Sequence, residues 1–201
     1  MSIEIELKAH VDNCEALKAI LMEKAEYSFA FEKEDVYWSP KETTQTGKPD
    51  SVPVKFRLRR EKRIYGDGRE ELRNCITYKK KEVRDGIEIN DEKEFEVSAR
   101  EESGRVVEEF LSLAGMEQGF SKKKKGWAFF KDGINAELLK VERLGWFLEL
   151  EIISGDTNHN RDKVIAPGRE KLLGFLDELG ISQDRIESRF YSEMLEGEDN
   201  E

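Results

Sequence analysis

The feature that most constrains the fold is an alternation of charged and apolar side chains with a period of two residues. In the first segment, Glu4, Glu6 and Lys8 occupy alternate positions, and the residues between them are isoleucine or leucine. Because successive side chains of a β-strand point to opposite faces, this spacing predicts a strand with one charged and one apolar face. This first segment covers residues 3–8, and the pattern recurs in residues 54–59, 76–81, 94–97 and 147–152.

Three further strands are predicted by β-branched and aromatic residues that lie between turn signals. They cover about residues 27–39, 120–130 and 134–141. The polar segment 40–53 contains Gly47, Pro49 and Asp50 and is typical of a loop. Residues 186–195 are expected to add a short final element.

Three helices are expected, after the first, fifth and eighth strands. Each has an apolar stripe at helical spacing and residues that favour helix ends. The first begins with a polar cap, the second with a capping box, and the third with a proline in its first turn. The predicted starts are Asp12 or Asn13, Ser98 with Glu101, and Pro167, and the predicted ends are Gly115 and Gly180.

Together these elements predict an α+β fold, an eight-stranded antiparallel β-barrel with helices packed outside. A chain of 201 residues is long enough for one domain with a well-developed core, and it shows no internal repeat or long linker. We therefore predict a single domain over residues 1–195. Residues 196–201 are predicted to form an acidic, mobile tail.

The charged faces of the strands allow two interpretations. Charged residues make up 39% of the chain, against roughly 25% in an average globular domain. A single alternating strand more often presents its charges to solvent. Five strands that agree favour a closed sheet whose apolar faces meet the helices and whose charged faces point into the lumen.

Such a lumen would contain both acidic and basic side chains. Residues two apart on one strand face lie about 7 Å apart, so paired carboxylates repel unless a cation lies beside them. Mg²⁺ or Mn²⁺ would satisfy the carboxylates, while Arg and Lys would bind phosphate oxygens. A phosphate-rich ligand bound together with a divalent metal is therefore the ligand class that the pattern favours.

Composition argues against several other classes. The net charge of −10 disfavours nucleic-acid binding. No apolar run approaches the roughly 20 residues needed to cross a bilayer, so no membrane association is expected. Cys14 and Cys75 lack metal-ligand spacing, and only His10 and His159 are available for a histidine site. A cytoplasmic protein with reduced thiols is the default expectation.

The order of short motifs resembles the CYTH domain, the family of triphosphate tunnel metalloenzymes. The first strand carries Glu4-x-Glu6-x-Lys8, which resembles the signature of the family, and matching motifs extend over nearly the whole chain. They are Asp35-Val-Tyr37, Phe56-Arg57-Leu-Arg59-Arg60, Ile76-Thr77-Tyr78-Lys79, Glu92-Lys-Glu94-Phe-Glu96, Leu144-Gly-x-Phe-x-Glu149-x-Glu151 and Ser188-Arg-Phe-Tyr191-Ser-Glu-Met-Leu195.

The resemblance implies an eight-stranded antiparallel tunnel that holds a triphosphate together with Mg²⁺ or Mn²⁺. It implies metal binding by Glu4, Glu6, Glu149 and Glu151. It also implies that basic residues bind the triphosphate, namely Lys8, Arg57, Arg59, Lys79, Lys81, Lys122 and Lys124.

This sequence departs from the family pattern at three places. The sixth strand has four lysines, 122–125, where Lys-x-Arg is common, and spacing from Gly133 favours Lys122 and Lys124 as the inward pair. The seventh strand has Leu139 where an Asp is common, and Glu137 is the alternative acid. Glu92 stands where an Arg is common.

Three functions remain open at this stage. The first is hydrolysis of ATP, tripolyphosphate or thiamine triphosphate, with Lys8 or Tyr37 orienting or deprotonating the attacking water. The second is a class IV adenylate cyclase, which forms cAMP and pyrophosphate from ATP. The third is a polyphosphate- or nucleotide-binding module without turnover. A homodimer is compatible with the resemblance.

Overall fold

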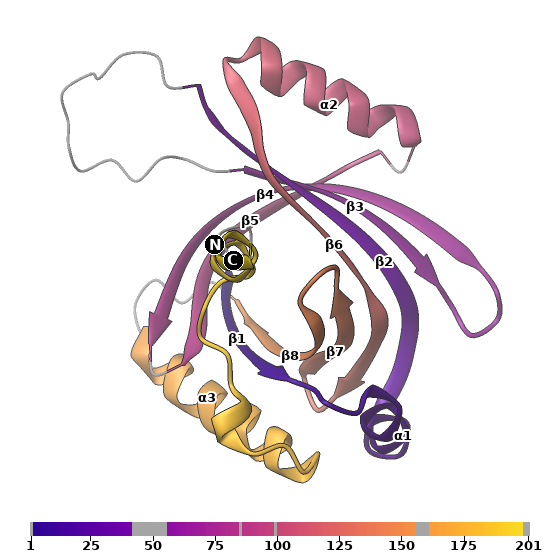
Figure 1. The fold of residues 1–201 in the computed structure, drawn as a ribbon, viewed down its shortest axis with the longest axis vertical. Helices are drawn as coiled ribbons and strands as arrows, with labels where there is room; N and C mark the ends of the chain where they lie inside the picture. Colours follow the sequence, from indigo (N-terminus) through magenta and orange to yellow (C-terminus); the bar gives the residue numbers. More distant parts are fainter. Residues whose placement is uncertain (1, 42–55, 85, 99, 156–160, 199–201) are drawn as a thin grey trace.

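The computed structural model describes residues 2–41, 56–84, 86–98, 100–155 and 161–198. Within this part, four α-helices and a short 3₁₀ helix accompany the strands (Figure 1). The helices are α1 (Cys14–Lys24), α2 (Glu101–Leu113), α3 (Arg161–Glu178), η1 (Gln183–Arg185) and α4 (Tyr191–Glu198). The strands are β1 (Ser2–His10), β2 (Glu26–Pro40), β3 (Phe56–Ile64), β4 (Glu70–Arg84), β5 (Ile87–Val97), β6 (Met116–Lys131), β7 (Ile134–Val141) and β8 (Gly145–Ser154).

All strands belong to one antiparallel sheet in the order β1-β5-β4-β3-β2-β6-β7-β8. Strand β1 pairs with β5 on one edge and with β8 on the other, so the hydrogen-bonded ring closes. In Figure 1, α1 and α3 lie outside this ring, whereas α4 lies within its outline. The predicted α+β class, an antiparallel sheet accompanied by a few helices, is confirmed.

The largest apolar core lies between the ring and the outer helices. Ile3, Ile5 and Leu7, the apolar face of β1, are buried there with apolar residues of α1 and α3. Helix α3 approaches β1 closely because Gly168 has no side chain: a Cβ added at this residue would lie 2.4 Å from Ile5 Cδ1. Packing of the apolar face outward leaves the charged face of the same strand inside the ring.

The predicted helix boundaries agree with the structure only in part. Asn13 caps α1 as predicted, and its Oδ1 accepts a hydrogen bond from the Ala16 backbone N–H at 3.1 Å. The predicted capping box is wrong, because α2 begins after Arg100, which makes no side-chain cap hydrogen bond. The predicted start at Pro167 is also wrong, because Pro167 lies inside α3. Apolar packing of α3 against the core maintains the helix on both sides of this proline.

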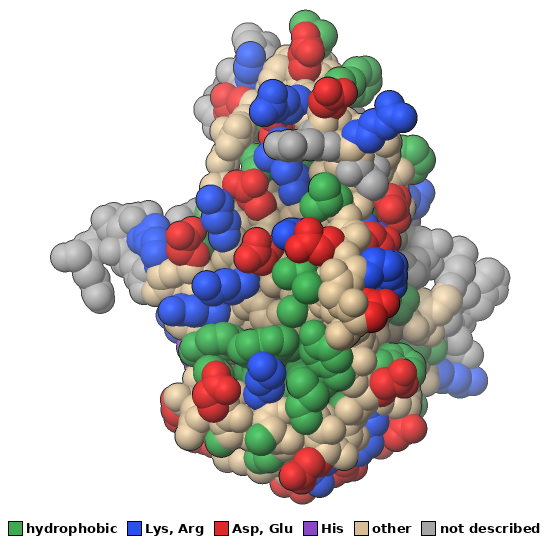
Figure 2. Space-filling model, turned by 90° about the vertical axis from the view of Figure 1, so that its right-hand side faces the viewer, with side chains coloured by type: hydrophobic (Ala, Val, Ile, Leu, Met, Phe, Trp, Pro, Cys, Tyr) green, Lys and Arg blue, Asp and Glu red, His purple; other side chains and the backbone are tan. Residues whose placement is uncertain are grey.

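The outer surface carries charges of both signs. Figure 2 shows Lys and Arg side chains interspersed with Asp and Glu on the face that lies to the right in Figure 1, around a group of hydrophobic side chains. No helix among the described residues combines the length and hydropathy needed to span a bilayer. Most of the predicted loop over residues 40–53 lies outside the described residues. So does the end of the predicted acidic tail, whose first residues continue α4.

Candidate active site inside the strand ring

A cavity of about 450 Å³ lies inside the ring and receives side chains from all eight strands. The alternation seen in the sequence is therefore an inward and outward alternation. Among the described residues, nine acidic and seven basic side chains line this cavity. A lumen with both signs of charge and an acidic excess suits an anion only if the anion arrives together with a cation.

The basic wall of the cavity is built around Arg59. Its guanidinium donates two hydrogen bonds to the Asp35 carboxylate, at 2.7 and 2.9 Å. Lys122 Nζ lies 3.8 Å from the same carboxylate. Burial alone would raise the pKa of Asp35, but the charge of Arg59 and its hydrogen bonds outweigh burial and hold this pKa well below its ordinary value. Asp35, which lies on the predicted second-strand motif, thus fixes the orientation of a predicted substrate-binding arginine.

Arg57 lies on the same face of β3 as Arg59. It donates hydrogen bonds to Thr77 Oγ1 at 3.0 Å and to Glu92 Oε1 at 3.3 Å. Its Nε is buried and has no hydrogen-bond partner within the described part of the chain. A buried guanidinium nitrogen without a partner is costly, so this donor has the capacity to bind a ligand oxygen.

The four predicted metal ligands lie on neighbouring strands β1 and β8. Glu6 and Glu151 are direct cross-strand partners, and Glu149 is the partner of Lys8. Glu4 accepts a hydrogen bond from Asn90 Nδ2 at 3.1 Å. Their carboxylate oxygens are the donor type that Mg²⁺ and Mn²⁺ prefer. In the described structure, no three acidic, histidine or cysteine side chains already converge on one point as metal ligands would.

Lys124 holds one of these carboxylates. Its Nζ lies 2.7 and 2.9 Å from the two oxygens of Glu149, and both side chains are buried. Burial disfavours both charges, yet their attraction lowers the pKa of Glu149 and raises that of Lys124. Metal binding at Glu149 would therefore free Lys124 to bind another anion.

The two predicted catalytic residues have different surroundings. Tyr37 lines the cavity, and Lys122 Nζ lies 5.5 Å from the centre of its ring. Lys8 is buried and donates hydrogen bonds to Glu88 Oε1 at 3.1 Å and to the Arg189 carbonyl oxygen at 2.7 Å. Tyr37 thus faces the cavity, whereas Lys8 is held between β5 and the C-terminal segment.

The remaining sequence predictions concern lysines on two strands. Lys122 and Lys124 both line the cavity, while Lys123 forms an ion pair with Glu34 on the outside. This is the register that the spacing favours. Lys79 and Lys81 lie in β4 opposite Glu92 and Asn90, but their side chains lie outside the described residues.

Leu139 lies inside the ring in an apolar layer. It is fully buried together with Phe31, Val141 and Phe147, which belong to the inward faces of their strands. The alternative acid, Glu137, lines the cavity and pairs with Lys33 at 2.5 Å. The common Asp position of the family is therefore apolar here because its surroundings are apolar.

Sequence reasoning assigned no role to Tyr191, although it lines the cavity. It belongs to the C-terminal motif, whose pattern alone does not show that the segment enters the ring. Glu88 and Lys33 were missed as well, because neither lies in a segment of clear alternation. Their long-range partners, Lys8 and Glu137, can be found only from the sheet topology.

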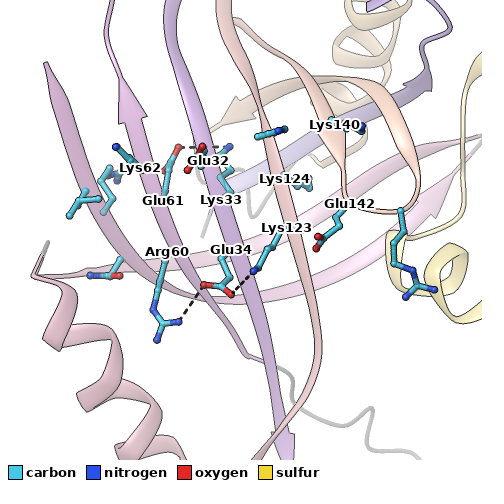
Figure 3. Close-up of a pocket in the computed structure, with 15 residues that line it drawn as sticks. Glu32, Lys33, Glu34, Arg60, Glu61, Lys62, Lys123, Lys124, Lys140 and Glu142 are labelled. Carbon is cyan, nitrogen blue, oxygen red and sulfur yellow. Dashed lines mark ion pairs between the residues drawn. The ribbon is translucent and has the colours of Figure 1, made fainter. Parts of the chain in front are cut away.

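A larger hollow of about 850 Å³ is lined mainly by charged residues (Figure 3), and four of them, Lys33, Glu61, Arg73 and Lys124, also line the cavity inside the ring. Some of its outer charges are paired between neighbouring elements: Glu34 lies 3.6 Å from Arg60 and 3.9 Å from Lys123, and Arg60 also reaches Glu108 at 2.7 Å. The Lys123 side chain is 64% exposed. Exposed pairs of this kind are typical of a solvated face, so the buried lumen remains the candidate site.

No protein-family model matches the sequence, and no match is found among curated proteins. Solved structures do match over nearly the full length. The PH1819 protein of Pyrococcus horikoshii OT3 is 23% identical, with 97% of this chain and 99% of that chain covered and a TM-score of 0.72. A candidate adenylate cyclase from Vibrio parahaemolyticus is 19% identical, with 96% and 98% covered and a TM-score of 0.71.

A third match is HpAC1 from Hippeastrum, a candidate adenylyl cyclase with a dominant triphosphatase activity. It is 17% identical, with 94% of this chain and 91% of that chain covered and a TM-score of 0.56. At these identities the likeness concerns the fold. The resemblance that the sequence motifs carry is thus confirmed at the level of architecture, and the chain has the fold of the CYTH, or triphosphate tunnel, family.

Proposed function

We propose that this protein is a divalent-metal-dependent triphosphatase that acts on an inorganic or organic triphosphate inside the ring. The observation that carries the proposal is the buried cavity in which Arg57, Arg59, Lys122 and Lys124 are enclosed together with an excess of carboxylates. Each basic group is held by a carboxylate or lies near one, so a metal-bound polyphosphate has both counter-charges available.

Glu4, Glu6, Glu149 and Glu151 would hold Mg²⁺ or Mn²⁺, which supplies positive charge to the phosphate oxygens when bound. Arg57, Arg59, Lys122 and Lys124 then bind the remaining oxygens and neutralise the charge that develops during transfer. We propose the same role for Lys79 and Lys81. The ion pair between Lys124 and Glu149 links the metal-binding carboxylates to the phosphate-binding basic residues. When Glu149 binds the metal, Lys124 becomes able to bind a phosphate oxygen.

In the proposed reaction, water attacks the terminal phosphorus and the bond between that phosphorus and its bridging oxygen breaks. The products are orthophosphate and the shortened phosphate chain, and one water proton leaves the nucleophile. Tyr37 lines the cavity and is our candidate for orienting the water. Lys8, bound to Glu88 and Arg189, is our candidate for keeping the metal-binding strand β1 in register.

The test is incubation with tripolyphosphate, thiamine triphosphate or ATP, each with Mg²⁺ or Mn²⁺. We expect release of orthophosphate, and a fall in kcat/KM of at least about 100-fold in Glu6→Gln and Glu151→Gln, because several kcal/mol of charge stabilisation are lost. The exposed Glu117→Gln is the matched control and keeps wild-type activity.

Other outcomes lead to other functions. Formation of cAMP and pyrophosphate from ATP would make the protein an adenylate cyclase, in which the ribose 3′-hydroxyl attacks the α-phosphorus. Tight binding without any product would make it a binding module. Full activity in Glu6→Gln and Glu151→Gln would show that the metal ligands are assigned to the wrong residues.

A further inference from the structure

The C-terminal segment of the chain is built into the wall of the cavity. The stretch 186–190, called the strap here, leaves the outer surface along β1: Ile186 forms a β-bridge with Ala9, and the Glu187 N–H donates to the Lys8 carbonyl oxygen at 2.8 Å. The next residue, Tyr191, begins α4. Its ring packs edge-on against Phe147 at 5.2 Å, inside the ring of strands.

Three lysine ammonium groups surround the ring of Tyr191. Lys8 and Lys122 lie 4.8 Å from the ring centroid, and Lys124 lies 4.7 Å from it. Ammonium groups within about 6 Å of an aromatic face are attracted by the ring quadrupole, most strongly where water is excluded. Tyr191 is only 6% exposed. One aromatic side chain therefore contacts ammonium groups from both β1 and β6, and each of these groups also lies near a carboxylate.

The surroundings of the Tyr191 hydroxyl are a second, independent observation. The hydroxyl is buried and, among the residues that the structure describes, has no hydrogen-bond partner of normal geometry, although it lies beside the Glu149 carboxylate. A phenolic hydroxyl can donate one hydrogen bond. Leaving a buried hydroxyl unpaired is costly unless a ligand or water completes it.

We propose, on the basis of the function argued above, that Tyr191 is a ligand-binding residue of the triphosphate site. Its ring positions Lys122 and Lys124, which line the cavity, around one anion, while Lys8 packs against the ring and stays bound to Glu88 and Arg189. Its hydroxyl donates a hydrogen bond to an oxygen of that anion once Glu149 turns to the metal. The C-terminal motif is thereby part of the active site, and not only a packing element.

Two substitutions separate the ring from the hydroxyl. Tyr191→Phe keeps the ring and removes the donor, whereas Tyr191→Leu removes both. We expect the dissociation constant for tripolyphosphate with Mg²⁺, measured by calorimetry, to rise about tenfold in the first variant and about 100-fold in the second, because one and then two sets of contacts are lost. In activity assays, KM should rise more than kcat falls.

The control is Tyr27→Phe, which alters a tyrosine that packs edge-on against Phe129 in the outer core. Thermal unfolding of Tyr191→Phe should match that of the wild type, so weaker binding cannot come from misfolding. Equal affinity in the wild type and both Tyr191 variants would overturn the role of Tyr191 and leave the proposed function standing. If the wild type binds no triphosphate, the proposed function fails, and this inference fails with it.

Discussion

At the scale of single residues, the inner face of the ring changes from charged to apolar within two residues along a strand. Glu137 and Glu149 line the charged cavity, and two residues along the same strands Leu139 and Phe147 are fully buried in the apolar layer. Two side chains that lie only two positions apart on one strand therefore have different surroundings, one charged and one apolar. The chemistry available at a position depends on which side of this boundary it lies.

The boundary between the charged cavity and the apolar layer predicts the effect of Leu139→Asp, which introduces the acid that is common at this position in the family. Leu139→Asp should destabilise the protein by about 3–5 kcal/mol and should not raise activity, because the carboxylate would be buried without a cationic partner. Urea unfolding measures the loss. Leu72→Asp, at a leucine that is 49% exposed, should change stability by less than about 0.5 kcal/mol. A stable and more active Leu139→Asp protein would contradict this account.

At the scale of elements, one carboxylate helps to hold the strap in addition to its backbone contacts with β1. Glu187 accepts hydrogen bonds from the backbone N–H and guanidinium of Arg189, at 2.6 to 3.0 Å, and pairs with His10 at 3.1 Å. The hydrogen bond from Arg189, more than any other contact, lowers the pKa of Glu187 from 4.5 to about 2. The strap that carries Tyr191 is therefore held in part by an ionised group.

Acid should release this strap within a defined range of pH. A carboxylate whose pKa is depressed by folding stabilises the folded state above its unfolded pKa and loses this effect as the pH falls through its folded pKa. The contribution of Glu187 is thus complete above pH 4.5 and disappears toward pH 2. Its upper limit is about 3 kcal/mol.

Hydrogen exchange of the backbone amides of α4, followed between pH 6 and pH 2, measures this release. Glu187→Gln should show the faster exchange of α4 already at pH 6, and the difference from the wild type should shrink as the pH falls. Equal exchange in the two proteins at pH 6 would show that Glu187 does not hold the strap.

The sequence allowed the strands to be predicted more readily than the caps or the C-terminal segment. The alternation in β1 and β8 is a direct consequence of a sheet with one apolar face, so it is visible in any window of six residues. The cap of α2 failed as a prediction because Ser98 and Glu101 fit a local pattern that the actual backbone does not use. The place of Tyr191 was hidden because it depends on contacts with residues more than 60 positions away.

At the scale of the whole molecule, the acidic excess of the lumen adds to the negative net charge of the chain. The net charge is −10, so a polyanion approaching alone is repelled both by the protein and by the carboxylates of β1 and β8. Metal and anion should therefore stabilise the folded state together far more than either does alone.

Thermal unfolding tests this coupling. Tripolyphosphate and Mg²⁺ together, at about 100 times the dissociation constant, should raise Tm by roughly 5–10 °C, because binding at this excess contributes about 2.7 kcal/mol. Tripolyphosphate with EDTA should give a much smaller shift. An equal shift with and without the metal would mean that the basic wall alone binds the anion and that the carboxylates are not metal ligands.

An apolar layer lies beside the charged part of the inner face and affects where a charged ligand can bind. It consists of Phe31, Leu139 and Phe147, with Tyr191 and Met194 from the C-terminal helix. A charged ligand would lose hydration against this layer without gaining a partner, so contact with it is unfavourable. A phosphate ligand of the proposed kind should therefore bind at the charged part of the inner face, and the apolar layer limits how far along the ring it extends.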